Sequence, residues 1–161
     1  MGEGGRGGLG LRLTTSSPEE TIELGRRLGT AAAAGDVLLL DGPFGAGKTH
    51  LVKGLAAGLG VDAVVTSPSF ILANEYAGRI PLYHLDLFRL EQLEPVTLTT
   101  LEEYLYGDGV CAVEWPALLP AHLRAGASEL TFRLTGEHTR EIGARLAAPR
   151  LREALRHAAG A

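Results

Sequence analysis

The feature that most constrains this sequence is a glycine-rich octapeptide in its first third. Residues 42–49 read Gly-Pro-Phe-Gly-Ala-Gly-Lys-Thr, a full match to the pattern G-x-x-x-x-G-K-[ST]. Glycines let backbone N–H groups surround a polyphosphate, Lys48 can reach the β and γ phosphates, and Thr49 offers a hydroxyl to magnesium. The alternative interpretation is an ordinary glycine-rich turn between a strand and a helix.

The residues on either side of this loop favour phosphate binding. Residues 36–41 (DVLLLD) form a short apolar run typical of a central parallel strand. Residues 50–59 (HLVKGLAAGL) repeat leucine every fourth position, which predicts a helix. The positive end of that helix would face bound phosphates. Strand, loop and helix in this order are the context that the motif requires.

The rest of the chain alternates between predicted strands and helices. Ser16 or Ser17 should cap the first helix, with Pro18 in its first turn, and Gly35 should end it. We expect further strands at 9–14, 70–76, 80–87, 110–114, 128–134 and 141–146, and helices at 18–34, 98–105 and 150–159. This alternation predicts an α/β fold, a three-layer P-loop NTPase sandwich with a mixed, mostly parallel sheet.

Length and composition are those of one globular domain. The chain has 161 residues, of which 45% are hydrophobic. We expect a disordered glycine-rich tail at residues 1–10 and a single P-loop ATPase domain at 11–161. No apolar run approaches the roughly 20 residues needed to cross a bilayer, and the N-terminus lacks a secretory signal. With Cys111 as the single cysteine, these features predict a cytoplasmic protein that has no membrane partner.

The charge of the chain also limits its partners. The formal net charge is −4, which argues against a dedicated nucleic-acid binder. The C-terminal quarter is richer in arginine. It could contact RNA or an acidic partner, or it could form a solvated helix face.

Two acidic residues at predicted strand ends could supply the chemistry that a phosphate-binding loop lacks. Asp86 follows the apolar run at 80–85, and Glu114 follows the run at 110–113. Because the carboxyl ends of parallel strands meet beside the loop, either acid could hold magnesium or orient water. A helix cap or a surface ion pair is the alternative for each.

Three neighbouring side chains leave their roles open. Thr66 and Ser67 lie where many P-loop proteins place a segment that responds to the γ-phosphate, although Ser-Pro also favours an ordinary turn. His84 shares a strand face with Asp86, so it could sense phosphate or simply pack in the sheet.

The chain lacks Asn-Lys-x-Asp, the usual guanine-reading element, which favours ATP over GTP.

Taken together, four motifs resemble those of the TsaE family. They are GAGKT (45–49), TSPSF (66–70), YHLDLFRL (83–90) and VEWP (113–116). The resemblance spans roughly residues 11–135 and implies a small bacterial ATPase of tRNA threonylcarbamoyladenosine biosynthesis. It implies ATP and Mg²⁺ as cofactors and the TsaB and TsaD proteins as partners, with tRNA contacted indirectly through that complex.

The resemblance also implies roles for individual residues. Asp86 and Glu114 would be catalytic, with the choice of the water-orienting one left open, and Thr49 with Glu114 would form the magnesium site. The expected nucleotide contacts are Ser17, Gly42, Gly45, Ala46, Gly47, Lys48, Thr49, His50 and Thr66. Pro43-Phe44 departs from the family, which commonly has an acidic-hydrophobic pair at this place.

Two other functions remain compatible with a P-loop. A small-molecule kinase could use the same loop, but it would need an acceptor pocket and an arginine-rich lid, and the sequence shows neither. A nucleotide-binding switch without turnover would use the loop for binding alone.

Overall fold

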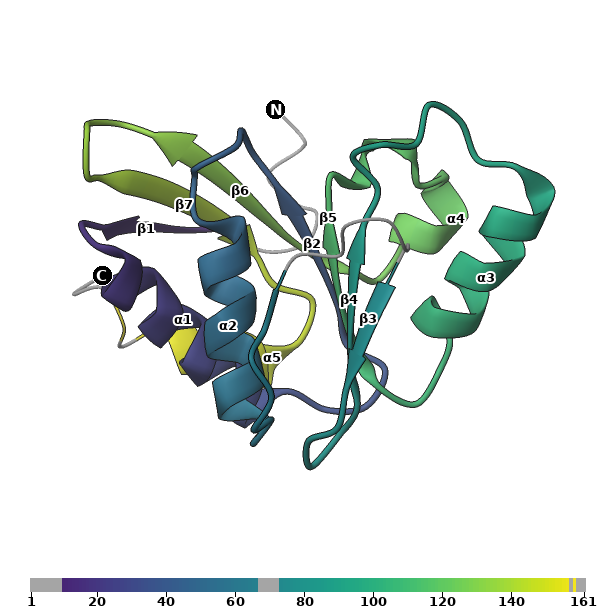
Figure 1. Cartoon of the computed structure of the whole chain (residues 1–161). Coiled ribbons are helices and arrows are strands. Elements are labelled where there is room, and N and C mark those ends of the chain that lie inside the picture. Colours follow the sequence, from purple (N-terminus) through teal and green to yellow (C-terminus); the bar gives the residue numbers. More distant parts are fainter. Residues whose placement is uncertain (1–9, 67–72, 157, 159–161) are drawn as a thin grey trace.

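The computed structural model describes residues 10–66, 73–156 and 158. These residues form one seven-stranded sheet in the order β1-β7-β6-β2-β5-β4-β3, flanked by helices (Figure 1). The strands are β1 (Leu11–Thr15), β2 (Val37–Asp41), β3 (Ala73–Tyr76), β4 (Leu82–Asp86), β5 (Val110–Glu114), β6 (Ser128–Leu134) and β7 (Arg140–Arg145). The helices are α1 (Pro18–Ala31), α2 (Lys48–Gly58), α3 (Pro95–Leu105), the 3₁₀ turn η2 (Pro116–Leu118), α4 (Ala121–Arg124) and α5 (Pro149–Arg156).

The sheet is parallel at its centre and antiparallel toward its edges. Strands β6, β2, β5 and β4 pair in parallel. Strand β3 pairs antiparallel with β4, and β7 lies antiparallel between β6 and β1. The central strands are buried on both faces, which explains their continuous apolar runs. The predicted mixed sheet with a mostly parallel core is confirmed.

Helices cover both faces of the sheet and create two apolar cores. Figure 1 shows α1, α2 and α5 on one side of the sheet and α3 and α4 on the other. Alternate residues of β2 enter different cores: Leu38 and Leu40 pack with α1 and α2, whereas Leu39 packs with α3 and α4. The predicted three-layer arrangement is therefore confirmed.

Element boundaries differ from the predictions where distant residues intervene. The first helix ends at Ala31 rather than near residue 34, because Ala32 is extended. The Arg79 guanidinium, from the turn after β3, donates to the carbonyls of Gly29, Thr30 and Ala32 and so satisfies that end. Gly35 has a positive φ of 92° but lies in the following turn. Residues 1–9 of the expected tail lie outside the described residues.

Helices α1 and α2 touch through their backbones. Each carries two glycines four residues apart, Gly25 and Gly29 on α1 and Gly54 and Gly58 on α2. A Cβ at Gly54 would lie 1.9 Å from the Ile22 carbonyl oxygen. A Cβ at Gly25 would lie 2.1 Å from the Leu51 carbonyl oxygen, so no larger residue fits at either glycine without parting the helices. This contact fixes α2, whose first turn carries Lys48 and Thr49, against α1.

Candidate functional site

The glycine-rich loop leaves β2 and enters α2 through three left-handed or unusual backbone conformations. The φ angles are 151° at Gly42, 78° at Gly45 and 105° at Gly47. Gly47 is the N-cap of α2 and lies against Thr21 of α1, and a Cβ at Gly42 would be 2.8 Å from the Phe132 carbonyl oxygen. These positions require glycine, because a side chain would be strained or would collide with β6. The loop thus sits at the carboxyl edge of the sheet with its amides next to a helix N-terminus.

Lys48 is buried inside this loop, with 4% of its surface exposed. Its Nζ donates to the Gly42 carbonyl and lies 3.4 Å from the centre of the Trp115 ring. Burial lowers the pKa of this ammonium, and the charges of Glu114, Asp41 and Asp86 oppose that effect. Among the described residues Lys48 forms no ion pair, so its charge is held by a carbonyl and a ring and can turn to an anionic ligand.

Thr49 and Glu114 meet across the gap between α2 and β5. The Thr49 hydroxyl donates to Glu114 Oε2 at 3.1 Å. The same carboxylate oxygen lies 2.7 Å from His84 Nε2, and both His84 and Glu114 are almost completely buried. Parallel pairing produces this convergence, since Glu114 is in register with Leu40 on β2 and with Asp86 on β4.

Asp86 lies at the same sheet edge as Glu114 but makes a different contact. Its Oδ1 accepts from the Phe88 backbone N–H at 2.9 Å, so it caps the turn that follows β4. Burial raises the pKa of this carboxyl, and the charge of Glu114 raises it further, whereas the Phe88 hydrogen bond lowers it. The structure therefore brings the two predicted acids together at one sheet edge, where Asp86 also stabilises the turn after β4.

Three aromatic rings gather beside the loop. Phe44 of the loop, Phe88 after β4 and Trp115 after β5 have ring centres 4.7–4.9 Å apart. Phe44 is 65% exposed and Phe88 is 49% exposed, and Trp115 adopts a positive φ of 57°. In the sequence, Trp115 is recognised only as part of the VEWP motif. The cluster itself depends on three separate chain segments meeting at one sheet edge.

The remaining predicted contact residues lie on α1, the loop, α2 and the segment before β3. Ser17 is the N-cap of α1, where its side chain accepts from the Glu20 N–H at 3.1 Å, and the first turn of α1 lies against the loop at Gly47. Ala46 is buried in the loop, and His50 is half-buried in the first turn of α2. The Thr66 carbonyl accepts from the Asn74 side-chain amide and the Tyr76 hydroxyl of β3, and its N–H donates to the same hydroxyl. Residues 67–70 of the TSPSF motif lie outside the described residues.

The donor set suits magnesium bound together with a polyphosphate. No group of three His, Cys, Asp or Glu side chains within the described ranges could hold a metal by itself. Mg²⁺ does not require such a cage, because one or two protein oxygens combine with phosphate and water ligands. The Thr49 hydroxyl and the Glu114 carboxylate, 3.1 Å apart next to the loop, fit that arrangement.

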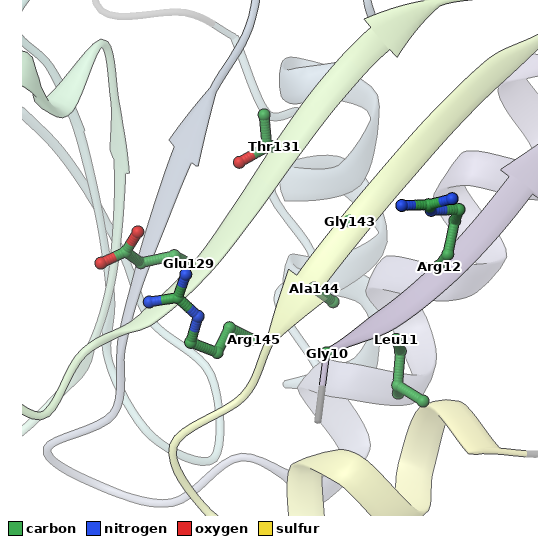
Figure 2. Close-up of a pocket in the computed structure, with 8 residues that line it drawn as sticks. All are labelled: Gly10, Leu11, Arg12, Glu129, Thr131, Gly143, Ala144 and Arg145. Atoms are coloured by element: carbon green, nitrogen blue, oxygen red, sulfur yellow. The ribbon is translucent and has the colours of Figure 1, made fainter. Parts of the chain in front are cut away.

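A concave region lies on the open face of β1, β7 and β6. It has a volume of about 510 Å³ and is lined by Gly10, Leu11, Arg12, Glu129, Thr131, Gly143, Ala144 and Arg145 (Figure 2). Gly143 forms its floor between Arg12 and Thr131, its register partners on the neighbouring strands. None of these residues belongs to the loop site.

No helix in the described part of the chain is long and apolar enough to span a membrane.

Comparisons with known proteins agree with one another. The family model "Threonylcarbamoyl adenosine biosynthesis protein TsaE" matches residues 15–142, a range that overlaps the motif resemblance and ends beyond it. The chain is 42% identical over 133 residues to the tRNA threonylcarbamoyladenosine biosynthesis protein TsaE of Bacillus subtilis, covering 82% of this chain and 83% of that protein. It is 47% identical over 114 residues to the protein of the same name from a Nostoc species, covering 68% and 70%.

The fold comparison gives the same result. The crystal structure of Bacillus subtilis YdiB superposes with a TM-score of 0.74 and 35% sequence identity, covering 91% of each chain. The chain therefore belongs to the TsaE family, the family of tRNA threonylcarbamoyladenosine biosynthesis.

Proposed function

We propose that this protein is a Mg²⁺-dependent ATPase that couples its nucleotide state to a TsaB–TsaD assembly. The observation that carries the proposal is the convergence of the loop, Lys48 and the Thr49–Glu114 pair at one sheet edge. A phosphate loop alone binds nucleotide, whereas a buried carboxylate bonded to the loop threonine adds the group that turnover requires.

The loop residues would hold the nucleotide. The amides of residues 45–49 and the Lys48 ammonium would bind the phosphates, and Thr49 with Glu114 would hold magnesium. Bound magnesium supplies charge neutralisation on the phosphate oxygens. The further nucleotide contacts that we propose are Ser17, Gly42, Ala46, His50 and Thr66.

Three side chains would act on the reaction. Lys48 must leave the Gly42 carbonyl to reach the phosphates, which moves its charge away from the Trp115 ring. Asp86 and Glu114 are adjacent in register, so either carboxylate can accept a hydrogen bond from a water aligned with the γ-phosphate. The pairing of two acids near one lysine supports catalysis rather than binding alone.

A binding experiment tests whether this protein associates with TsaB and TsaD in a way that depends on the nucleotide. Tagged protein is mixed with TsaB and TsaD in the presence of Mg-ATP, Mg-ADP or no nucleotide, and the retained proteins are quantified. We expect retention to change with the nucleotide and to be lost in Lys48→Ala. Absence of association under every nucleotide condition would refute the coupling.

Labelled ATP separates hydrolysis from a kinase reaction. The γ-phosphate should appear as inorganic phosphate in the presence of the partners. Transfer of the label to a metabolite would favour the small-molecule kinase, and stable ATP without phosphate release would favour a switch that does not turn over.

A further inference from the structure

His84 occupies an unusual position for a polar side chain. It lies in the middle of β4, in register with Asn74 on β3 and Ala112 on β5, and none of its surface is exposed. Its neighbours on the strand, Leu82 and Leu85, are also fully buried. An apolar residue would pack at this position without any hydrogen-bonding requirement, so the imidazole needs a separate explanation.

The two ring nitrogens have different surroundings. Nε2 lies 2.7 Å from Glu114 Oε2, whereas Nδ1 has no hydrogen-bond partner among the described residues. A carboxylate only accepts hydrogen bonds, so Nε2 must carry the proton that lies between them. The bare Nδ1 then loses the water that it would have in solution, a cost that packing alone does not offset.

His84 and Thr49 each form one hydrogen bond with the same oxygen of Glu114. Oε2 accepts from His84 on one side and from the Thr49 hydroxyl at 3.1 Å on the other. With both donors present, the carboxylate is held in one rotation facing the first turn of α2. Without His84, the carboxylate keeps the bond from Thr49 but loses the donor on its other side, so it can turn away from α2.

We propose that His84 is a positioning residue, which orients Glu114 for magnesium through the Nε2–H···Oε2 bond. The inference rests on the proposed Mg-ATP site and adds to it a residue that does not touch the nucleotide. Partners that orient a metal-binding carboxylate typically change metal affinity or activity by 10- to 100-fold when removed. The effect should appear in the magnesium requirement and not in nucleotide binding without metal.

The test compares His84→Leu with His84→Gln. Leucine fills the space without a donor, whereas the glutamine amide can place an N–H near the position of Nε2. We expect His84→Leu to raise the magnesium concentration for half-maximal phosphate release about 10- to 100-fold. His84→Gln should stay within about threefold of wild type, because it keeps the donor. The matched control is His138→Gln, an exposed histidine in the β6–β7 turn, which should change nothing.

Two further measurements separate positioning from general damage. Magnesium titration of nucleotide binding, followed by the fluorescence of Trp115, should show the same shift without any turnover. In a Glu114→Ala background, His84→Leu should have little additional effect, because its action passes through that carboxylate. If His84→Leu does not fold, His84→Met takes its place in the same comparisons.

The outcomes distinguish this inference from the function on which it rests. If wild-type protein binds no Mg-ATP, the proposed function fails and this inference fails with it. If wild type and Glu114→Ala behave as proposed but His84→Leu keeps the wild-type magnesium requirement, only the positioning role is wrong. The positioning role is also wrong if His84→Leu raises the magnesium requirement by the same factor in wild-type protein and in Glu114→Ala.

Discussion

Replacing Gly54 with alanine tests the packing that holds the nucleotide loop. The new Cβ would lie 1.9 Å from the Ile22 carbonyl oxygen and 2.8 Å from the Arg26 nitrogen, both on the α1 backbone. Restoring even a 3.0 Å separation requires the helices to part by about 1 Å, which loosens an apolar interface along their length. Backbone atoms cannot rotate away as side chains do, so we take the upper end of overpacking costs, about 3 kcal/mol.

Part of that cost is offset by the helix itself. Alanine is favoured over glycine inside a helix by about 1 kcal/mol, so the net loss should be about 2 kcal/mol. For a chain of this size the melting temperature should fall by roughly 4–8 °C. Because α2 begins with Lys48, Mg-ATP binding should weaken as well. Thermal unfolding without nucleotide gives the melting temperature. The rise in that temperature when Mg-ATP is added reports the strength of binding.

The matched control is the same substitution at Gly143. A Cβ there would meet no atom within 4 Å, and the site lies on the open sheet face of Figure 2. We expect its unfolding free energy to stay within about 0.5 kcal/mol of wild type. Close packing of α1 and α2 is not the cause if Gly54→Ala has the melting temperature of the wild type, or if Gly143→Ala lowers that temperature by the same amount.

Three further predictions concern the site. Lys48→Ala should weaken ATP binding at least about 10-fold in calorimetry, because a charged hydrogen-bond donor to the phosphates is lost; unchanged affinity would remove Lys48 from the site. Glu114→Ala should leave ATP binding within a few-fold and reduce phosphate release about 100-fold in a phosphate assay; normal turnover would refute its assignment. The emission of Trp115, the single tryptophan, should change when Mg-ATP binds, since Lys48 must leave its ring; constant emission at saturation would contradict that movement.

Local sequence was sufficient to predict the loop and the elements around it. The spacing of Gly45, Gly47, Lys48 and Thr49 follows from phosphate geometry, and the apolar run before it is typical of a parallel strand. The acids at the ends of two apolar runs could be placed at one edge, because parallel strands bring their carboxyl ends together. The strands predicted at 70–76 and 80–87 overlap β3 and β4.

Other features depend on contacts that sequence periodicity does not encode. The Glu114–His84 bond joins residues 30 positions apart and requires the exact register of β4 and β5. Likewise, Arg79, far along the chain, satisfies the carbonyls at the end of α1. The short elements η2 and α4 are too brief for a periodic signal.

One missed feature did have a signal in the sequence. Gly25 and Gly29 in the first predicted helix, and Gly54 and Gly58 in the second, each repeat at four-residue spacing on one helix face. Glycine destabilises a helix interior, so two such pairs indicate that another backbone lies very close. The structure shows that these two helices approach each other at those glycines.

Residues 42–49 would act, in the function proposed above, as a site for magnesium-bound ATP. Calorimetric titration of the folded chain with ATP, in the presence and absence of Mg²⁺, tests it most directly, with Lys48→Ala titrated in parallel. We expect saturable binding to one site, tighter with Mg²⁺ in the wild type and strongly weakened in the variant. Absence of ATP binding by the wild type, both alone and with TsaB and TsaD present, would contradict it.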